Sequence, residues 1–449
     1  MASKGRIKIQ CFNGENTYIP VDKAKVTITP TGEVASINGS TKEVSTDSSG
    51  QTIEIEVDAP PIQYSEEPNN NIPYSFVDIK VERDGFNTLF IQSAQIFPDR
   101  LAIQNCDLQQ NRYSRQPEVI EVLPNTLLGS YPAKIPEDPE KILPPPPSGT
   151  VVLPNPVIPE FIIVHQGSPN DPSAPNYKVT FKDYIKNVAS CEIYPTWSRS
   201  TIAANILCII SFTLNRVYTE WYTGKGKNFT ITSSTAYDHA FNYGRNIFDT
   251  IDVVVEEIFS TYIKRIGRKQ PLLAQYCDGK NVQCPGWMTQ WGSKYLGDEG
   301  KTPIQILRNF YGSDIELTTA QKVSGVPKSY PGYTLGLGSK GEPVKTIQNY
   351  LNVIARSYPL IPKVIEDGIY GSKTRESVKV FQSVFGLPQI GVVDYATWYK
   401  ISDVYVGVTK IAELRGTLEG IERIFYPPMT YEMSQSKNIP SVTYFDDLF

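Results

Sequence analysis

The sequence is poor in the residues that most often bind metal ions. Its 449 residues include two histidines, His165 and His239, and six cysteines. A structural zinc site normally takes four Cys or His ligands that lie close together, so we expect no metal site and no cofactor. The cysteines are too sparse for a disulfide scaffold. The one close pair, Cys277 and Cys284, can be two free thiols, a disulfide or part of a metal site.

The sequence also lacks an excess of positive charge. Its 43 Lys and Arg residues against 47 Asp and Glu residues give a net charge of −4. A nucleic-acid-binding domain usually carries a basic field, and no run of like charges suggests an electrostatic membrane anchor. We therefore expect no nucleic-acid partner and no membrane partner.

An apolar signal peptide is missing as well. Residues 1–10 alternate small, charged and apolar side chains, without the apolar core of an export signal. The most apolar helix candidate, residues 202–212, contains Asn205 and Ser211 and is too short to span a bilayer. The expectation is synthesis in the cytoplasm without a signal peptide.

The length predicts about three domains, at roughly 100–200 residues per domain. Residues 1–114 contain several short segments that alternate apolar and polar residues, such as 5–12 and 24–29, with turn residues between them. This pattern predicts a β-sandwich, and its order of strands and turns resembles carboxypeptidase-regulatory-like sandwich modules. We interpret residues 1–114 as a pre-region that chaperones, targets or inhibits the rest.

A proline-rich segment follows at residues 115–150 and includes four consecutive prolines at 144–147. Proline fixes φ and removes a hydrogen-bond donor, so this segment is expected to be extended and poorly foldable. Composition alone favours a linker, and an exposed extended chain would also fit the cleft of a processing protease.

Residues 151–325 mix short apolar segments with helical patterns, which predicts a mixed α/β (α+β) domain. Residues 161–164 are expected to form a strand, and the pattern from Thr180 to Asp183 starts a helix. Further helices are expected at residues 200–222, 247–263 and 302–310.

Glu192 is the carboxylate best placed for chemistry. It lies one turn after Val188 on the apolar face of the helix expected to begin at Thr180. Burial near Tyr194 and Trp197 would disfavour the charged form and raise the pKa of its carboxyl group. A raised pKa is what a general acid needs in order to protonate a glycosidic oxygen. The alternative is a helix-end glutamate paired with a lysine.

Glycosidases usually need two carboxylates at a defined separation. The candidates for a second one, Asp238, Asp249 and Asp252, are each better explained as structural residues. In a lytic transglycosylase the substrate's own 6-hydroxyl attacks, so one residue can donate the proton and later act as the base. The single marked carboxylate therefore favours this chemistry.

Two motifs resemble the catalytic domain of the stage II sporulation protein D family of lytic transglycosylases. The first is D-Y-I-K-N-V-A-S-C-E at residues 183–192, followed by Trp197 and A-A-N-I-L at 203–207. The second is M-T-Q-W-G-S at residues 288–293, followed by G-K-T at 300–302 and F-Y-G at 310–312.

The resemblance implies that Glu192 is the catalytic residue. It also implies that the glycan cleft is lined by Trp197, Thr289, Gln290, Trp291 and Tyr276, although core packing is the alternative for both tryptophans. Two positions depart from the family pattern, because Ile210 stands where the family has an arginine and Trp287 where it has a glycine.

Residues 335–401 are expected to form two or three helices and resemble the small helical peptidoglycan-binding domain. The motifs are D-G-I-Y-G-S-K-T at 367–374 and G-V-V-D at 391–394, followed by Trp398. The resemblance assigns four residues to the peptidoglycan-binding module: Asp367, Tyr370, Gly371 and Trp398.

The order of all these parts, with a C-terminal strap at residues 402–449, is similar to that of the spore-cortex-lytic enzymes of the SleC type. This implies a zymogen that a subtilisin-like germination protease cuts near Thr150 and Val151. It also implies spore cortex peptidoglycan as substrate, anhydro-muramic acid products, and a location in the cortex or coat region of the spore after synthesis in the mother cell. The alternatives are a hydrolytic muramidase or glucosaminidase, or a non-catalytic peptidoglycan-binding spore protein.

Overall fold

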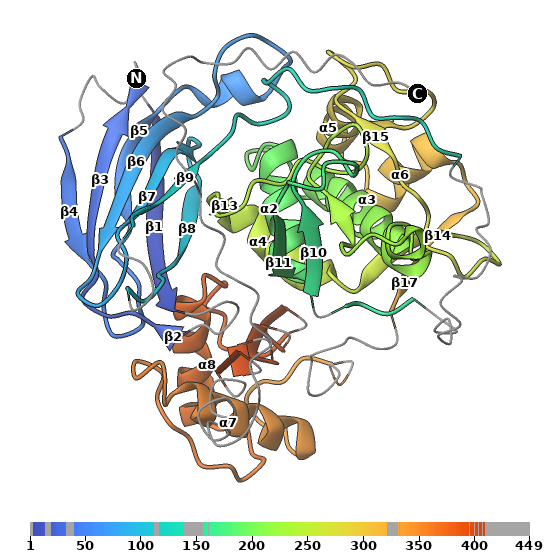
Figure 1. Ribbon diagram of the computed structural model, residues 1–449. Coiled ribbons are helices and arrows are strands. Elements are labelled where there is room, and N and C mark those ends of the chain that lie inside the picture. The colour runs from blue at the N-terminus through green and yellow to red at the C-terminus, as the bar shows by residue number, and fades with distance from the viewer. Residues whose placement is uncertain are drawn as a thin grey trace.

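The structure is a computed structural model. It describes residues 3–13, 19–32, 40–111, 116–138, 156–159, 161–320, 331, 333–394, 396–398, 400–402, 404–405 and 407–408. The expected processing site at Thr150 and Val151 lies outside the described residues, as does the C-terminal strap from residue 409 onward. The chain is multidomain, with mixed α and β structure and a helical C-terminal region (Figure 1).

Two five-stranded sheets make up most of the N-terminal part (Figure 1). The first contains β1 (Ser3–Asn13), β2 (Ile19–Pro20), β5 (Ile55–Ala59), β8 (Leu101–Asp107) and β13 (Ile247–Phe248). The second contains β4 (Lys42–Ser45), β3 (Lys25–Thr31), β6 (Ser75–Glu82), β7 (Leu89–Ile96) and β9 (Glu118–Glu121). In β1 and β6 every second side chain is buried, as the alternating sequence pattern predicts.

One strand of the first sheet comes from the middle of the chain. Strand β13 pairs antiparallel with β8, with Phe248 opposite Ala102. The expected helix over 247–263 is therefore wrong at both ends, because helix α4 covers only Asp249–Ile258 and strand β14 covers Thr261–Arg265. Apolar residues at the two ends complete sheets with distant strands, and such tertiary pairing overrides local helical periodicity.

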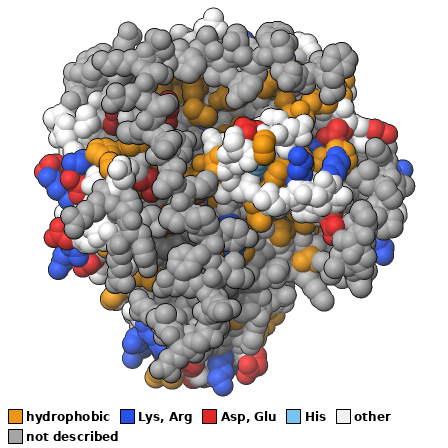
Figure 2. All heavy atoms as spheres, viewed as in Figure 1, with side chains coloured by type: hydrophobic (Ala, Val, Ile, Leu, Met, Phe, Trp, Pro, Cys, Tyr) orange, Lys and Arg blue, Asp and Glu red, His pale blue; other side chains and the backbone are white. Residues whose placement is uncertain are grey.

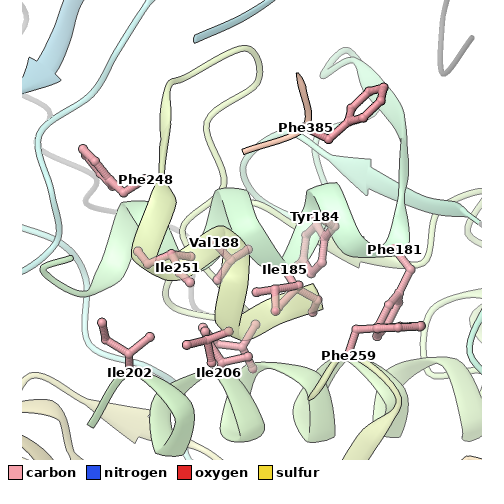
Figure 3. Close-up of a cluster of buried hydrophobic side chains, with 14 of the residues drawn as sticks. Phe181, Tyr184, Ile185, Val188, Ile202, Ile206, Phe248, Ile251, Phe259 and Phe385 are labelled. Atoms are coloured by element: carbon pink, nitrogen blue, oxygen red, sulfur yellow. The ribbon is translucent and has the colours of Figure 1, made fainter. Parts of the chain in front are cut away.

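The middle part is built around a central helix. Its helices are α2 (Phe181–Glu192), α3 (Arg199–Tyr218), α4, α5 (Gln290–Asp298) and α6 (Pro303–Tyr311). Its short strands are β10 (Phe161–His165), β11 (Asn176–Thr180), β12 (Ile231–Thr232), β14, β15 (Tyr276–Cys277), β16 (Met288–Thr289) and β17 (Ile315–Thr319). Helix α3 contacts each of the other four helices. Figure 3 shows side chains of α2, α3 and α4 meeting in this core, among them Val188, Ile206 and Ile251.

Helix α3 is long and apolar enough to cross a membrane by length and composition alone. Residues 202–212, which we expected to be too short to span a bilayer, form only the middle of this helix. However, 89% of its apolar window is buried inside the protein. A helix that is apolar all round and surrounded by other elements is a core helix, and we interpret α3 as one.

Helix α2 begins where the sequence predicts. Thr180 is its N-cap, and the hydroxyl of Thr180 accepts a hydrogen bond from the backbone N–H of Asp183 at 3.1 Å. This bond satisfies one of the free N–H groups of the first turn. The helix ends at Glu192, and Ile193 is already extended, two residues before Pro195. The backbone therefore leaves the helix directly after the candidate acid.

The helical C-terminal region includes α7 (Glu342–Ile354) and α8 (Ser372–Val384). It contacts both other parts of the molecule. The side-chain amide of Gln51 donates a hydrogen bond to the carbonyl of Val384, and the ammonium of Lys400 lies 3.6 Å from the carboxylate of Glu256. On the described part of the face in Figure 2, both Lys and Arg side chains and Asp and Glu side chains appear, mostly toward the edges of the view.

Candidate active site

The carboxyl group of Glu192 is the centre of the candidate site. Its side chain is buried at 4% exposure. Atom Oε1 accepts a hydrogen bond from the backbone N–H of Ala240 at 2.7 Å, and Oε2 accepts one from the hydroxyl of Tyr276. Glu192 is the last residue of α2, and its two carboxyl oxygens are bound by the loop that carries Ala240 and by strand β15, which carries Tyr276. Such bonds fix the orientation of the carboxyl group.

Burial has the largest effect on the acidity of Glu192. It raises the pKa of the carboxyl group, and the positive charge of Lys134 and the bonds from Tyr276 and Ala240 oppose it. The result is a pKa of about 6. Desolvation is the usual way in which a glutamate acquires the acidity of a general acid near neutral pH.

The two sequence motifs meet at Glu192. The side-chain amide of Gln290 donates a hydrogen bond to the backbone carbonyl of Glu192 at 3.0 Å. Gln290 is the first residue of α5, and the hydroxyl of Thr289 caps that helix by accepting from the N–H of Gly292 at 3.2 Å. The helix start thus aims Gln290 at the backbone carbonyl of Glu192, which has no partner within α2 because it lies in the last turn.

Tyr276 is held by a histidine that sequence reasoning did not assign to the site. The rings of Tyr276 and His239 stack with centroids 5.9 Å apart, and Nδ1 of His239 lies 2.9 Å from the hydroxyl of Tyr184. Burial, then the charges of Lys134 and Arg216, hold the pKa of His239 well below its ordinary value. The imidazole is therefore neutral and serves as a packing surface.

A pocket of about 70 Å³ adjoins the carboxyl group of Glu192. Tyr276 and Gln290 line it together with Glu192, so the structure brings three of the sequence-predicted site residues to one place. The rest of its wall consists of Thr126, Gly129, Tyr131, Pro132, Lys134, Thr235, Cys277, Asp278, Asn281 and Val282.

Five of these wall residues, from Thr126 to Lys134, belong to the segment expected to be a linker. Burial lowers the pKa of the Lys134 ammonium to about 8, against the opposing charge of Glu192. A lysine beside the helix-end glutamate was an alternative interpretation of the sequence. Nothing in the sequence indicates which lysine this is, because Lys134 and Glu192 meet only through the tertiary fold.

Asp278 is a second carboxylate in the pocket, and sequence reasoning missed it. Its two oxygens accept hydrogen bonds from the backbone N–H groups of Asn281 and Val282, each at 2.8 Å. The same loop is closed by a disulfide between Cys277 and Cys284. This pairing decides among the three states open to those cysteines. The one hint in the sequence that Asp278 belongs to the site is that it directly follows Cys277, a member of the only close cysteine pair.

The three aspartates considered from the sequence do not line this pocket. Asp238 binds the guanidinium of Arg216 at 2.8 Å, and Asp252 binds the ammonium of Lys186 at 2.6 Å. Asp249 accepts a hydrogen bond from the N–H of Thr250 at 2.9 Å. Each side chain has a structural partner within the fold.

The two tryptophans predicted to line the cleft lie in the protein core. Trp197 and Trp291 are 3% and 4% exposed, and their ring centroids lie 5.1 Å apart. The indole N–H of Trp197 donates to the carbonyl of Ser65 at 2.9 Å. Neither ring lines the pocket beside Glu192. Their position corresponds to the core-packing alternative.

No group of three or more His, Cys, Asp and Glu residues within the described ranges is arranged to hold a metal ion. Ile210, at the position of the family's arginine, is fully buried in α3.

The residues assigned to the peptidoglycan-binding module shape a turn and a core. The carboxylate of Asp367 accepts from the side-chain amide of Gln348 at 2.9 Å, and Gly371 donates its N–H to the carbonyl of Ile369 at 2.9 Å. Tyr370 and Trp398 are each 1% exposed. Their glycan contacts stay a prediction.

Residues 340–401 match the family model described as "Putative peptidoglycan binding domain". The chain carries a peptidoglycan-binding domain. This supports peptidoglycan as a partner and a role at the cell wall.

The other comparisons add little. No curated protein matches the chain. Among solved structures, a chlorocatechol 1,2-dioxygenase from Pseudomonas putida matches with 13% identity and a TM-score of 0.15. The match covers 26% of this chain and 59% of that chain. At this level the likeness carries no argument about fold or function.

Proposed function

We propose that this protein is a lytic transglycosylase that cleaves peptidoglycan glycan strands, with Glu192 as the catalytic residue. One observation carries the proposal: a buried carboxyl group with a pKa of about 6 adjoins a pocket. Its burial raises that pKa, which keeps the proton on the acid at a pH where an exposed glutamate has lost it. The peptidoglycan-binding domain at residues 340–401 supports the substrate class.

In this mechanism Glu192 acts twice. It first donates its proton to the oxygen that bridges muramic acid and glucosamine, and the bond from the muramic acid carbon to that oxygen breaks. The carboxylate then accepts the proton of the 6-hydroxyl of the same muramic acid, which closes the anhydro ring. Tyr276 and the N–H of Ala240 stabilise the carboxylate formed between the two steps.

We further propose that the substrate is spore cortex peptidoglycan and that the protein acts in germination. Its N-terminal sheets would form a β-sandwich pre-region, and a subtilisin-like protease would cut near Thr150 and Val151. The support is the motif resemblance over residues 183–312 and the order of the parts. In this proposal the protein lies in the cortex or coat region of the spore.

A hydrolytic muramidase or glucosaminidase is the second candidate, and Asp278 is the observation that favours it. Two carboxyl groups beside one pocket are the usual equipment of a glycoside hydrolase. Against this, both oxygens of Asp278 already accept backbone N–H groups of its own turn. Replacing Asp278 by Asn tests the assignment: a hydrolase that uses Asp278 would lose about 10²–10⁴-fold in rate, whereas a transglycosylase would keep its anhydro products.

Product analysis tests the proposal directly. The full chain, cut within residues 139–155 at an inserted protease site, is incubated with purified cortex peptidoglycan, and the soluble products are analysed by mass spectrometry. We expect anhydro-muramic acid ends, which lack one water relative to hydrolysis products. The Glu192→Gln variant should fold and release none.

Two results would count against the proposal. Reducing ends without anhydro ends would favour the hydrolase. Normal lysis by the Glu192→Gln variant would remove Glu192 from the mechanism. If neither protein releases anything but both bind the polymer, the non-catalytic binding protein is the better description.

A further inference from the structure

Residues 125–138 supply part of the wall of the pocket beside Glu192, and we call them the occluding segment. They follow strand β9 and precede the expected cleavage region. The start of the segment is bound to the end of α2, close to Glu192. The side-chain amide of Asn125 donates to the carbonyl of Ile193 at 3.2 Å, and the N–H of Thr126 donates to the carbonyl of Cys191 at 2.9 Å.

The middle of the segment places Lys134 in the candidate site. The ammonium of Lys134 donates to the carbonyl of Asp238 and lies over two rings, 4.8 Å from the centroid of Phe212 and 5.2 Å from that of Tyr276. Lys134 and Glu192 line the same pocket. A sugar that approaches Glu192 through this pocket therefore meets the lysine and its neighbours first.

The end of the segment is bound as an extended peptide. The N–H of Ile135 donates to the carbonyl of Ala236 at 2.7 Å. The amide of Gln275 accepts from the N–H of Glu137 and donates to the carbonyl of Ile135, both at 2.9 Å. The carboxylate of Glu137 accepts two bonds from the guanidinium of Arg216, at 3.0 and 2.5 Å. Bidentate pairs of this kind are strong and directional.

We propose that the occluding segment fills the groove in which the glycan strand binds, and that Lys134 blocks access to Glu192 until the segment leaves. The inference rests on the proposed function and adds the location of the glycan groove and its regulation. The groove follows the path of the segment, past residues 235–240 and 275–278. Its polar groups, which now bind an extended backbone, are of the kind that binds sugar hydroxyls.

Charge adds to the steric block. The ammonium of Lys134 lowers the pKa of Glu192, so it favours the carboxylate over the acid that the first step needs. Departure of the segment would remove this charge while Tyr276 and Ala240 stay in place. A cut within residues 139–155 would give the segment a free end beyond Asp138, which allows it to leave without unfolding of the sheets.

The first experiment uses the intact, uncut chain. The double variant Lys134→Ala with Glu137→Ala removes two anchors of the segment. We expect it to release at least tenfold more soluble cortex fragments than the intact wild-type chain. The matched control is Lys80→Ala with Glu82→Ala, a partly exposed ion pair of 2.7 Å in strand β6 of the same N-terminal part. This control should stay as silent as wild type.

The outcomes separate the inference from the proposed function. Suppose that the cut wild-type chain and the cut double variant both lyse cortex, while the intact double variant stays silent. The occluding segment is then not the inhibitor, and the inference fails while the proposed function stands. If the cut wild-type chain releases nothing, the proposed function fails, and the inference is decided by binding instead. The intact Glu192→Gln chain that also carries Lys134→Ala and Glu137→Ala should bind isolated glycan strands at least tenfold more tightly than the intact Glu192→Gln chain. Equal binding by the two chains would overturn the inference.

A crosslink provides an independent readout. The hydroxyl of Thr235 donates to the carbonyl of Pro132 at 3.3 Å, so the two residues are neighbours, and a cysteine pair introduced at these positions and oxidised to a disulfide would lock the segment in the groove. The locked, cut chain should be inactive and recover on reduction. The cut wild-type chain with and without reductant controls for opening of the bond between Cys277 and Cys284. Full activity of the locked chain would contradict the proposal.

Discussion

The hydroxyl of Tyr276 donates a hydrogen bond to Oε2 of Glu192. This bond joins the loop that carries Asp278 to the end of the helix that carries the candidate acid. Because it stabilises the carboxylate form, it opposes the effect of burial on the pKa of Glu192. The predictions for activity follow from the balance between these two effects.

The pH dependence of lysis should follow the protonation of Glu192. Its pKa is about 6 with Lys134 in place. A general acid works in its protonated form, so the rate should fall about tenfold per pH unit above that pKa. In the cut chain, when the glycan fills the groove in place of the segment, Glu192 stays buried but the charge of Lys134 is gone, so the falling limb of kcat should lie above pH 6. Initial rates of cortex lysis between pH 4 and 9 measure this. A flat profile above pH 6 would contradict the acid role.

The Tyr276→Phe variant should raise the pKa of Glu192 further, because the carboxylate loses a donor. A bond to a charged group contributes on the order of 1.5–3 kcal/mol, which corresponds to roughly one to two pH units. The falling limb of the pH profile should move upward by about that much, and the fold should lose some stability because a buried carboxylate oxygen loses its donor. The control is Tyr295→Phe, an exposed tyrosine of α5 that should leave the profile unchanged.

The Trp197→Ala variant should destabilise the protein. Trp197 is buried and packs against Tyr194 and Trp291. Deleting such a ring costs on the order of 3–5 kcal/mol of the free energy of unfolding. Denaturant unfolding measures the loss. If Trp197 instead binds the glycan, Trp197→Phe would raise KM at an unchanged unfolding midpoint, which is the opposite of what we expect.

The Glu256→Gln variant should destabilise the protein by about 3–5 kcal/mol, because it removes the buried carboxylate that pairs with two buried ammonium groups, of which Lys186 keeps only Asp252 of the two carboxylates it binds. Glu256 binds Lys182 at 3.0 Å and Lys186 at 2.5 Å. Glu82→Gln, in the partly exposed pair with Lys80, should cost less than about 1 kcal/mol. Denaturant unfolding of both variants at neutral pH makes the comparison.

The same carboxylate predicts a loss of stability in acid. Burial alone would raise the pKa of Glu256, but the charges of Lys182, Lys186 and Lys400 outweigh it and lower the pKa. A carboxyl group whose pKa is lower in the folded state stabilises the fold above its unfolded pKa, and this contribution is lost as the pH falls. The wild-type chain should therefore lose stability below about pH 4.5 more steeply than the Glu256→Gln variant.

Much of the secondary structure near the site follows from local rules. The alternation in β1 and the cap at Thr180 are readable without a structure, and so is the end of α2 near Glu192. The expected helix over 247–263 fails because its two ends pair with strands far away in the sequence. Local periodicity carries no information about such partners.

The sequence by itself determined that Glu192 stands at the end of an apolar helix face and that residues 340–401 form a peptidoglycan-binding domain. These features depend on spacing, capping and motif residues within short stretches. The tertiary structure alone decided that Tyr276, Asp278 and Lys134 surround that carboxyl group, and that Trp197 lies in the core. Burial and charge pairing arise between segments far apart in the chain, and these set the acidity of Glu192 and its access to substrate.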